Sequence, residues 1–301
     1  MAKTRALRRR IRTIESTRQV TRTMEMVSTS KLKRAQDRVV GARPYAQALA
    51  EVMGDLLDPE LAERFPLLRQ PASPAKGGPS RAAVLLITSN RGLAGAFNAN
   101  LIRAARERVA ELEGAGLTVD LLVVGKKAIS YFKFVRRPLA LARLDIGDRP
   151  TAAHAAELVE PLIARFEAGE LASLDVVFAQ FKSALTTPPT VVRVLPVQEE
   201  RTHGRTGAQT HGKSVANFIL KPGADELLGA LLPLYVRNLV FRALVETAAS
   251  EHGARRTAMK NATDNAGEIL DILKRTYNRA RQGQITQELA EIVGGAEALK
   301  G

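Results

Sequence analysis

Side chains that could carry out acid–base or metal chemistry are few in this chain of 301 residues, and they are scattered along it. No metal-ligand spacing joins the four histidines, so a surface or packing role fits each better: His154, His203, His211 and His252. The central carboxylates show no pairing that the sequence identifies: Asp120, Asp145, Asp148 and Asp175. The motifs HExxH, GxSxG and Walker A are missing, and so is cysteine. We therefore predict no catalytic site, no metal site and no bound cofactor.

One glycine-containing stretch, SNRGLAGAFN (Ser89–Asn98), has the position that a phosphate-binding loop would have. It follows a predicted strand and precedes a predicted helix. Its glycines, Gly92 and Gly95, have the spacing G-x-x-G, which lacks the dinucleotide-binding fingerprint G-x-G-x-x-G. A tight strand-to-helix turn is therefore the preferred interpretation, and a nucleotide site is the alternative.

The positive charge of the chain is concentrated near its N-terminus. The net charge is +14, and between Lys3 and Arg43 thirteen lysines and arginines are opposed by only three carboxylates, a local net charge of +10. Like charges on successive helical turns repel each other, so we expect an acidic partner, with a solvated face as the alternative. Basic surfaces for single-stranded nucleic acid interleave aromatic residues, and this segment has none before Tyr45. Contact with the phosphates of a duplex stays open.

The two ends of the chain have the apolar periodicity of long helices. Residues 3–57 repeat apolar positions at steps of three and four, with Pro44 as a place for a kink or a new turn. A second long helix is predicted over Asp225–Val293, with a stop at Gly294-Gly295. Its small residues would allow a partner helix to approach closely: Ala262, Ala266 and Ala280. We expect the two helices to pair as an antiparallel coiled coil, and we expect no uninterrupted apolar run long enough to span a membrane.

The middle of the chain alternates strands and helices, which is typical of an α/β layer with a largely parallel sheet. Strands are predicted at Ala82–Thr88, Val119–Val124, Leu174–Phe181 and Thr190–Val197, and helices at Phe97–Leu112 and Ala152–Phe166. The last two strands are joined by a link that suits an antiparallel hairpin at one edge. A polar loop over 199–217 and a short strand, Phe218–Leu220, follow.

The predicted fold is thus an α/β class domain combined with a long coiled coil, in which a Rossmann-like α/β domain is inserted between antiparallel N- and C-terminal helices. The predicted boundaries are 1–57 for the first helix, 58–80 for a linker rich in proline and glycine, 81–220 for the α/β domain and 221–301 for the second helix.

Three motifs in order carry a resemblance to a known family. They are RRRIRTIESTRQVTRTMEMVSTSKLKRAQ (Arg8–Gln36) with ARPYA (Ala42–Ala46), then SNRGLAGAFN, and finally ASEHGARRTAMKNATDNA (Ala249–Ala266) with YNRARQGQITQELAEIVGGA (Tyr277–Ala296). The chain resembles the γ subunits of bacterial F-type ATP synthases from end to end. It departs from the family pattern at Asn90, Ala94, Ala96, Gly253 and Arg256, and it lacks the cysteine insert of the chloroplast branch.

The resemblance implies a rotor stalk without a catalytic site of its own. Its implied partners are the α and β subunits of the catalytic hexamer, the ε subunit and the membrane c-ring, with no nucleic acid and no direct membrane insertion. The implied location is peripheral, on the cytoplasmic face of the bacterial plasma (inner) membrane. The residues that match the family's contact positions are Met24, Arg255, Gln282 and Thr286. For Met24, packing inside the coil is an equal alternative. A basic coiled-coil protein that binds nucleic acid and an α/β enzyme with helical arms are the competing classes.

Overall fold

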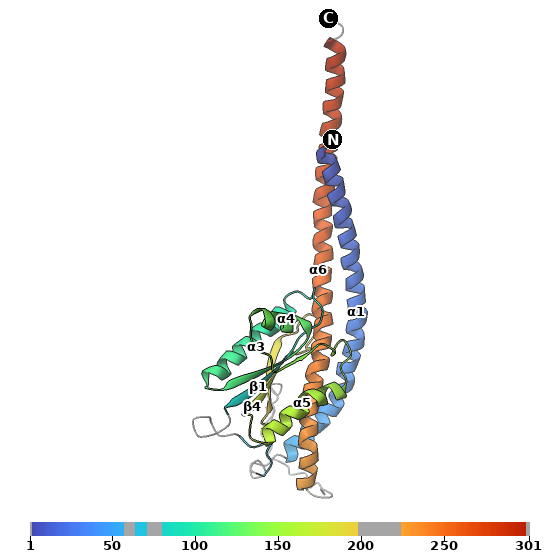
Figure 1. Cartoon of the computed structure of the whole chain (residues 1–301). Coiled ribbons are helices and arrows are strands. Elements are labelled where there is room, and N and C mark those ends of the chain that lie inside the picture. The colour runs from blue at the N-terminus through green and yellow to red at the C-terminus, as the bar shows by residue number, and fades with distance from the viewer. Residues whose placement is uncertain (1, 57–63, 71–79, 198–223, 299–301) are drawn as a thin grey trace, which may run out of the picture. The chain divides into compact units, whose positions relative to one another are not determined.

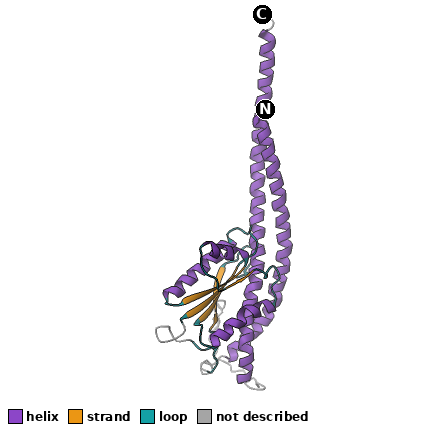
Figure 2. Ribbon diagram, viewed as in Figure 1, coloured by secondary structure: helices purple, strands orange, loops and turns teal. Residues whose placement is uncertain are grey.

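A computed structural model of the chain describes residues 2–56, 64–70, 80–197 and 224–298 (Figure 1). The chain divides into two compact units: a coil unit, Met1–Ser30 with Arg255–Gly301, and an α/β unit, Lys31–Ala254. Two long helices, α1 (Ala2–Leu56) and α6 (Ala224–Ala298), supply residues to both units (Figure 2). The predicted fold class, an α/β domain inserted between two long terminal helices, is confirmed.

In the coil unit, α1 and α6 lie side by side and run in opposite directions. The Thr4 hydroxyl donates to the side-chain oxygen of Gln284 at 3.1 Å, and the hydroxyls of Thr21 and Thr263 are hydrogen-bonded at 2.8 Å. As the residue number rises along α1 it falls along α6, which confirms the predicted antiparallel pair. Of the three small residues predicted for the seam, Ala266 is buried, while Ala262 and Ala280 are half-buried.

The α/β unit is built on a five-stranded sheet with the order β3-β2-β1-β4-β5. The strands are β1 (Arg81–Ile87), β2 (Thr118–Val124), β3 (Leu141–Arg143), β4 (Ser173–Ala179) and β5 (Pro189–Leu195). All neighbours pair in parallel except β4 and β5, which are antiparallel. The predicted antiparallel hairpin at one edge of a parallel sheet is therefore confirmed.

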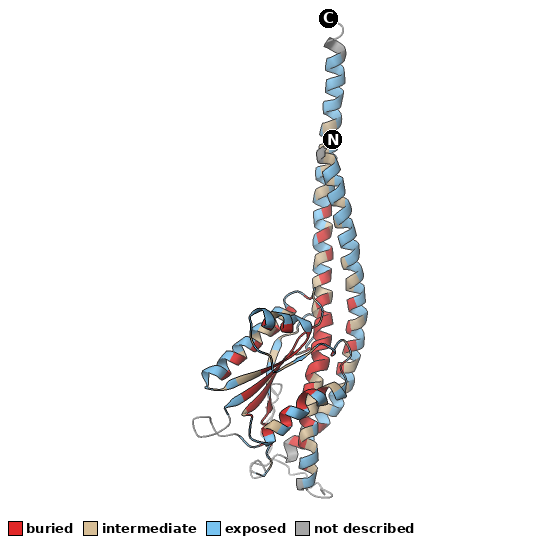
Figure 3. Cartoon of the chain, in the orientation of Figure 1, coloured by how far each residue is buried: buried red, intermediate tan, exposed pale blue. Residues whose placement is uncertain are grey.

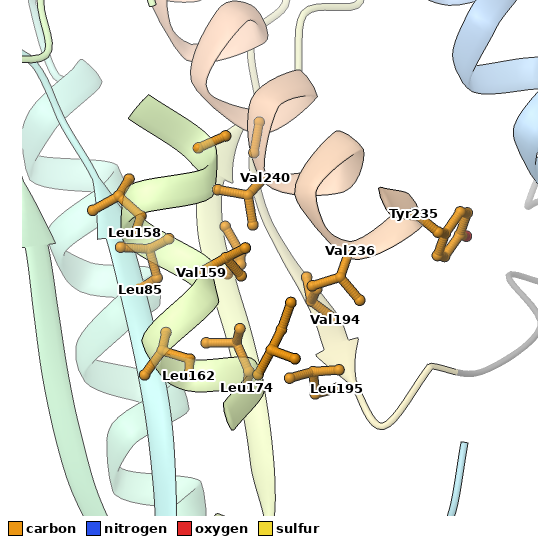
Figure 4. Packing of buried hydrophobic residues seen from close by; sticks show 14 of the residues in the cluster. Leu85, Leu158, Val159, Leu162, Leu174, Val194, Leu195, Tyr235, Val236 and Val240 are labelled. Carbon is orange, nitrogen blue, oxygen red and sulfur yellow. The ribbon is translucent and has the colours of Figure 1, made fainter. Parts of the chain in front are cut away.

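Helices cover both faces of this sheet, so its central strands are buried on both sides. Side chains of α3 (Phe97–Gly114) and α4 (Lys126–Phe134) pack with Val84 of β1, whereas α5 (Ala152–Glu167) and α6 pack with Leu85. Figure 4 shows part of the second of these cores, where side chains of α5 and α6 meet side chains of β1, β4 and β5.

Two elements of the α/β unit, α4 and β3, were not predicted. The nine residues of α4 are too few for a convincing helical period, and the three residues of β3 are held by pairing with Leu122–Val124 of β2. In both cases tertiary contacts, which a local pattern does not reveal, decide the structure.

The predicted stop of the C-terminal helix at Gly294-Gly295 is wrong, because α6 continues to Ala298. Neither glycine has the positive φ that ends a helix in a left-handed cap, so both only weaken it. Pro44 and Pro233 also lie inside the long helices. The predicted loop 199–217, the strand Phe218–Leu220 and most of the predicted linker 58–80 lie outside the described residues.

One 18-residue window of α6 is apolar enough to cross a membrane by length and composition alone. No uninterrupted apolar run of that length occurs in α6, as expected, because Arg237 and Arg242 divide its apolar part. The apolar part of α6 includes Leu228, Leu232 and Val236, and all three are buried in the core against the sheet. These buried side chains belong to the 44% of the window that packs inside the structure.

Candidate functional site

The first candidate surface is the basic side of α1 in the coil unit. Five arginines within its first turns are exposed: Arg5, Arg8, Arg9, Arg10 and Arg12. Glu15 is one of the few acids nearby, and it pairs with Lys274 of α6 at 3.2 Å. The remaining positive charge therefore faces outward, where it can meet an acidic surface of another protein.

The second candidate surface lies at the C-terminal end of α6. Four large apolar side chains are about half exposed or more there: Ile285 (48%), Leu289 (57%), Ile292 (68%) and Val293 (59%). Their spacing places them along one side of a helix. Gln284 contacts Thr4, near the start of α1, so α6 extends beyond its partner helix over these residues (Figure 1). We call this set the tip stripe. An exposed apolar stripe of this kind marks a contact with another protein.

The four residues matched to the family's contact positions fall into two places. Gln282 and Thr286 are exposed on adjacent turns, where the Thr286 hydroxyl donates to the Gln282 carbonyl oxygen at 3.0 Å. Met24 is half-buried, and Arg255 is only 7% exposed. Arg255 is thus buried in the chain alone. Along α6, Arg255 and Gln282 are separated by roughly 40 Å of helix, so the four residues do not form one site.

The stretch Ser89–Asn98 forms the turn from β1 to α3, and its polar groups bind one another. The backbone N–H and the hydroxyl of Ser89 both donate to Asn98 Oδ1, at 3.1 and 3.0 Å. Nearby, Gly125 has φ +104°, and a Cβ there would overlap the Thr88 carbonyl. The geometry agrees with the tight-turn interpretation, because Ser89 and Asn98 at the two ends of the stretch bind each other.

A cavity of about 510 Å³ opens at the carboxyl ends of β1 and β2. Asp145, Asp148 and Glu251 contribute carboxylates to its wall. Asp145 accepts hydrogen bonds from Arg143 at 2.8 and 2.6 Å, and Asp148 is paired with Lys31. The Arg143 hydrogen bonds lower the pKa of Asp145 to about 2. Within the described residues no group of three acidic, histidine or cysteine side chains is arranged to hold a metal ion.

Sequence reasoning missed a buried polar cluster on α6, where the helix meets the end of β4. Thr247 Oγ1 accepts from the Ala179 N–H at 3.3 Å, and the Ser250 hydroxyl donates to the Ala179 carbonyl at 3.1 Å. Glu246 accepts from the Phe181 N–H at 3.1 Å. The last residue of β4 paired to β1 is Val177, so these side chains take the place of a neighbouring strand. The signal was a polar run inside an otherwise apolar helical stretch.

Comparison with known proteins identifies the family of the chain. The family model described as ATP synthase matches residues 3–299. An ATP synthase gamma chain of Gemmatimonas aurantiaca is 57% identical, with complete coverage of both chains, and one of Moorella thermoacetica is 42% identical, again with complete coverage of both.

Solved structures show the same fold. A chain from the Euglena gracilis mitochondrial ATP synthase, in a structure of its OSCP, F1 and c-ring parts, has a TM-score of 0.65 at 18% identity. The match covers 99% of this chain and 95% of that one. A chain from the Tetrahymena thermophila central stalk and c-ring has a TM-score of 0.57 at 19% identity, with 81% and 99% coverage. The full-length family match and the identity to curated gamma chains lead to one conclusion: the chain belongs to the γ-subunit family of ATP synthases.

Proposed function

We propose that this chain is the central rotor stalk of an F-type ATP synthase. In this role it couples proton-driven rotation of a membrane ring to ATP synthesis and hydrolysis in the catalytic β subunits. The observation that carries the proposal is the coil unit: two antiparallel helices whose outer surface offers a basic side and an apolar tip stripe, rather than a constellation of catalytic groups.

A rotor must exchange one set of contacts for another as it turns. Exposed ion pairs contribute only ~0–1 kcal/mol each, so arginines on α1 can leave one acidic partner and meet the next at low cost. An axle that interlocked deeply with one catalytic subunit would be trapped at one angle. The exposed arginines of α1 suit the rotor role for this reason.

The proposed partners are the α and β subunits around the coil unit, and the ε subunit and membrane c-ring around the α/β unit. Gln282 and Thr286 are exposed and suit direct contact with these subunits. Met24 is half-buried and Arg255 is buried, so less of each side chain would be available for such a contact. The domain boundaries 1–57, 58–80, 81–220 and 221–301 stay part of the proposal. So does the peripheral location on the cytoplasmic face of the bacterial plasma membrane.

The nucleic-acid alternative is not supported, since the family match spans the chain and the relatives are ATP synthase gamma chains. We also propose that the chain has no catalytic site of its own. Isothermal titration calorimetry with ATP tests this point, because micromolar binding to the isolated chain would contradict it.

The main test is purification of the tagged chain from membranes of its native host. We expect it to bring down two nucleotide-binding subunits in a complex that survives added salt. Recovery of the chain alone, or with nucleic acid that dissociates steeply as salt rises, would refute the rotor function.

A further inference from the structure

The loop 144–149, which connects β3 to α5 within the α/β unit, contacts several elements at once. Its Ile146 side chain is buried in the core with α5 and α6. Its Asp148 side chain instead contacts Lys31 of α1 and His252 of α6. We call this segment the clasp loop.

The side chain of Asn90, which follows β1, ties the clasp loop to the end of the sheet by hydrogen bonds. Its amide nitrogen donates to the carbonyl oxygens of Leu144 and Ile146, at 2.9 and 3.2 Å. Its amide oxygen accepts from the backbone N–H of Lys126, the first residue of α4, at 2.9 Å. One side chain therefore joins the end of β1, the start of α4 and the clasp loop. A carboxylate at this position could keep the bond from Lys126 but could not donate to the two carbonyls.

Asp148 joins the clasp loop to both long helices. From α1, Lys31 Nζ lies 2.6 Å from Asp148 Oδ2, and Arg38 Nη1 donates to the Asp148 carbonyl at 2.9 Å. From α6, Nε2 of the buried His252 lies 3.5 Å from Asp148 Oδ1. One residue thus contacts α1 through two cations and α6 through a third group.

The charge on Asp148 is stabilised where it stands. Partial burial opposes ionisation, but the Lys31 hydrogen bond and the positive charges of His252, Lys31 and Arg91 together lower the pKa of this carboxyl. Charge-assisted hydrogen bonds are about twice as strong as neutral ones and have a preferred direction.

We propose that Asp148 is a positioning residue through which the α/β unit holds α1 and α6 against rotation. The proposal rests on the rotor function. Apolar packing is non-directional, so the cores alone resist separation better than they resist sliding. A directed ion pair to Lys31 of α1 and a close contact with the buried His252 of α6, both made by a loop that Asn90 anchors to the sheet, oppose turning of those helices against the sheet under load. The clasp loop binds helices of its own chain and no substrate. Loss of these contacts should therefore uncouple rotation rather than block ATP hydrolysis.

The test uses the assembled complex in inverted membrane vesicles, with ATP-driven proton pumping and ATP hydrolysis measured together. The variant is Asp148→Ala, and the matched control is Asp145→Ala, which removes the same charge from the same loop but breaks a pair only with Arg143. For Asp148→Ala we expect the number of protons pumped per ATP hydrolysed to fall roughly twofold or more. The loss should not be complete, because Arg38 still binds the backbone carbonyl of residue 148. For the control the ratio should stay unchanged. Asp148→Glu should restore part of the ratio, and Asn90→Asp should lower it with Asp148 intact.

Equal ratios for Asp148→Ala and Asp145→Ala would overturn the clasp while leaving the rotor function in place. Failure of the wild-type chain to support pumping at all would overturn the rotor function itself. If Asp148→Ala does not assemble, Lys31→Ala removes the same ion pair from the α1 side. A wild-type ratio for that variant would likewise refute the proposal.

Discussion

The same helix, α6, has two different environments along its length. From Ala243 to Gly253, in the α/β unit, every residue is buried (Figure 3). In the coil unit, the described part of α6 buries one side chain per turn, and none after residue 270: Arg255, Met259, Thr263, Ala266 and Leu270. A helix that is buried on all sides is fully covered by residues of its own chain. A helix with one narrow buried stripe leaves most of its surface uncovered.

The rest of the coil unit confirms the contrast. Between residues 4 and 30 of α1 only Ser28 is buried, while Val20 and Val27 are more than half exposed. On α6, Ile272 is 63% exposed. The α/β unit therefore carries its own core, and the coil unit keeps apolar and basic surface available for other subunits.

The largest expected effect comes from truncating one leucine in each environment of α6. Leu244 is 2% exposed in the core, whereas Leu273 is half-buried in the coil. Leu244→Ala should lower the free energy of unfolding by about 2–5 kcal/mol, through lost transfer energy and an unfilled cavity. Leu273→Ala should cost clearly less. Urea denaturation of the isolated chain, followed by circular dichroism, measures both, and equal costs would break the comparison.

A smaller effect is expected from overpacking the coil seam. Ala266 is 6% exposed, so a tryptophan there has no room unless the helices spread. Ala266→Trp should cost roughly 1–3 kcal/mol and reduce ATP-driven proton pumping in inverted vesicles. Thr286→Ala removes an exposed hydroxyl at a proposed contact position, and it should reduce pumping less, because exposed polar contacts can be exchanged at modest cost. If Ala266→Trp pumps like wild type, the seam assignment is wrong.

Reversal of the basic side should change the chain's own stability still less. Arg8, Arg9, Arg10 and Arg12 are all exposed, so replacing them with glutamate should leave the unfolding curve of the isolated chain almost unchanged. Assembly or turnover of the complex should nevertheless fall, because four charges act together against an acidic partner. Arg9→Ala alone should have little effect. Normal assembly of the fourfold variant would contradict the proposed contact.

The long helices and the sheet could be predicted because their signals are local. The order of apolar residues within a segment indicates by itself which side chains are buried, as in the predicted helix 3–57 and the predicted strand Ala82–Thr88. Both elements are present in the structure, with small changes at their ends. The strand β3 and the helix α4 could not be predicted, because pairing and packing with distant residues stabilise them.

The contacts of the candidate surfaces were less predictable. Arg255 reads as an exposed polar residue within a coil, yet it is buried, because burial depends on which elements converge on that turn. Asn90 and Asp148 are separated by 58 positions, and no spacing rule connects them through the clasp loop. The structure gives Asp145 and Asp148 cationic partners, Arg143 and Lys31, which no local sequence pattern identifies.

The smallest expected effect concerns Asp145, which is 51% exposed and paired with Arg143. Its pKa is lowered from 3.8 to about 2, so the pair stabilises the folded chain above pH 3.8 and the contribution disappears as the pH falls towards 2. Solvent screening limits the contribution to at most about 1 kcal/mol. Asp145→Asn should therefore unfold slightly earlier in urea than wild type at neutral pH, and the two curves should converge near pH 2. Salt at about 1 M should shrink the difference at neutral pH, since the screening length falls to roughly 3 Å. If the urea curves of wild type and Asp145→Asn differed equally at neutral pH and near pH 2, Asp145 would act through packing rather than charge. The surface of the α/β unit would then be stabilised by packing, like its core, and would differ from the coil in this respect.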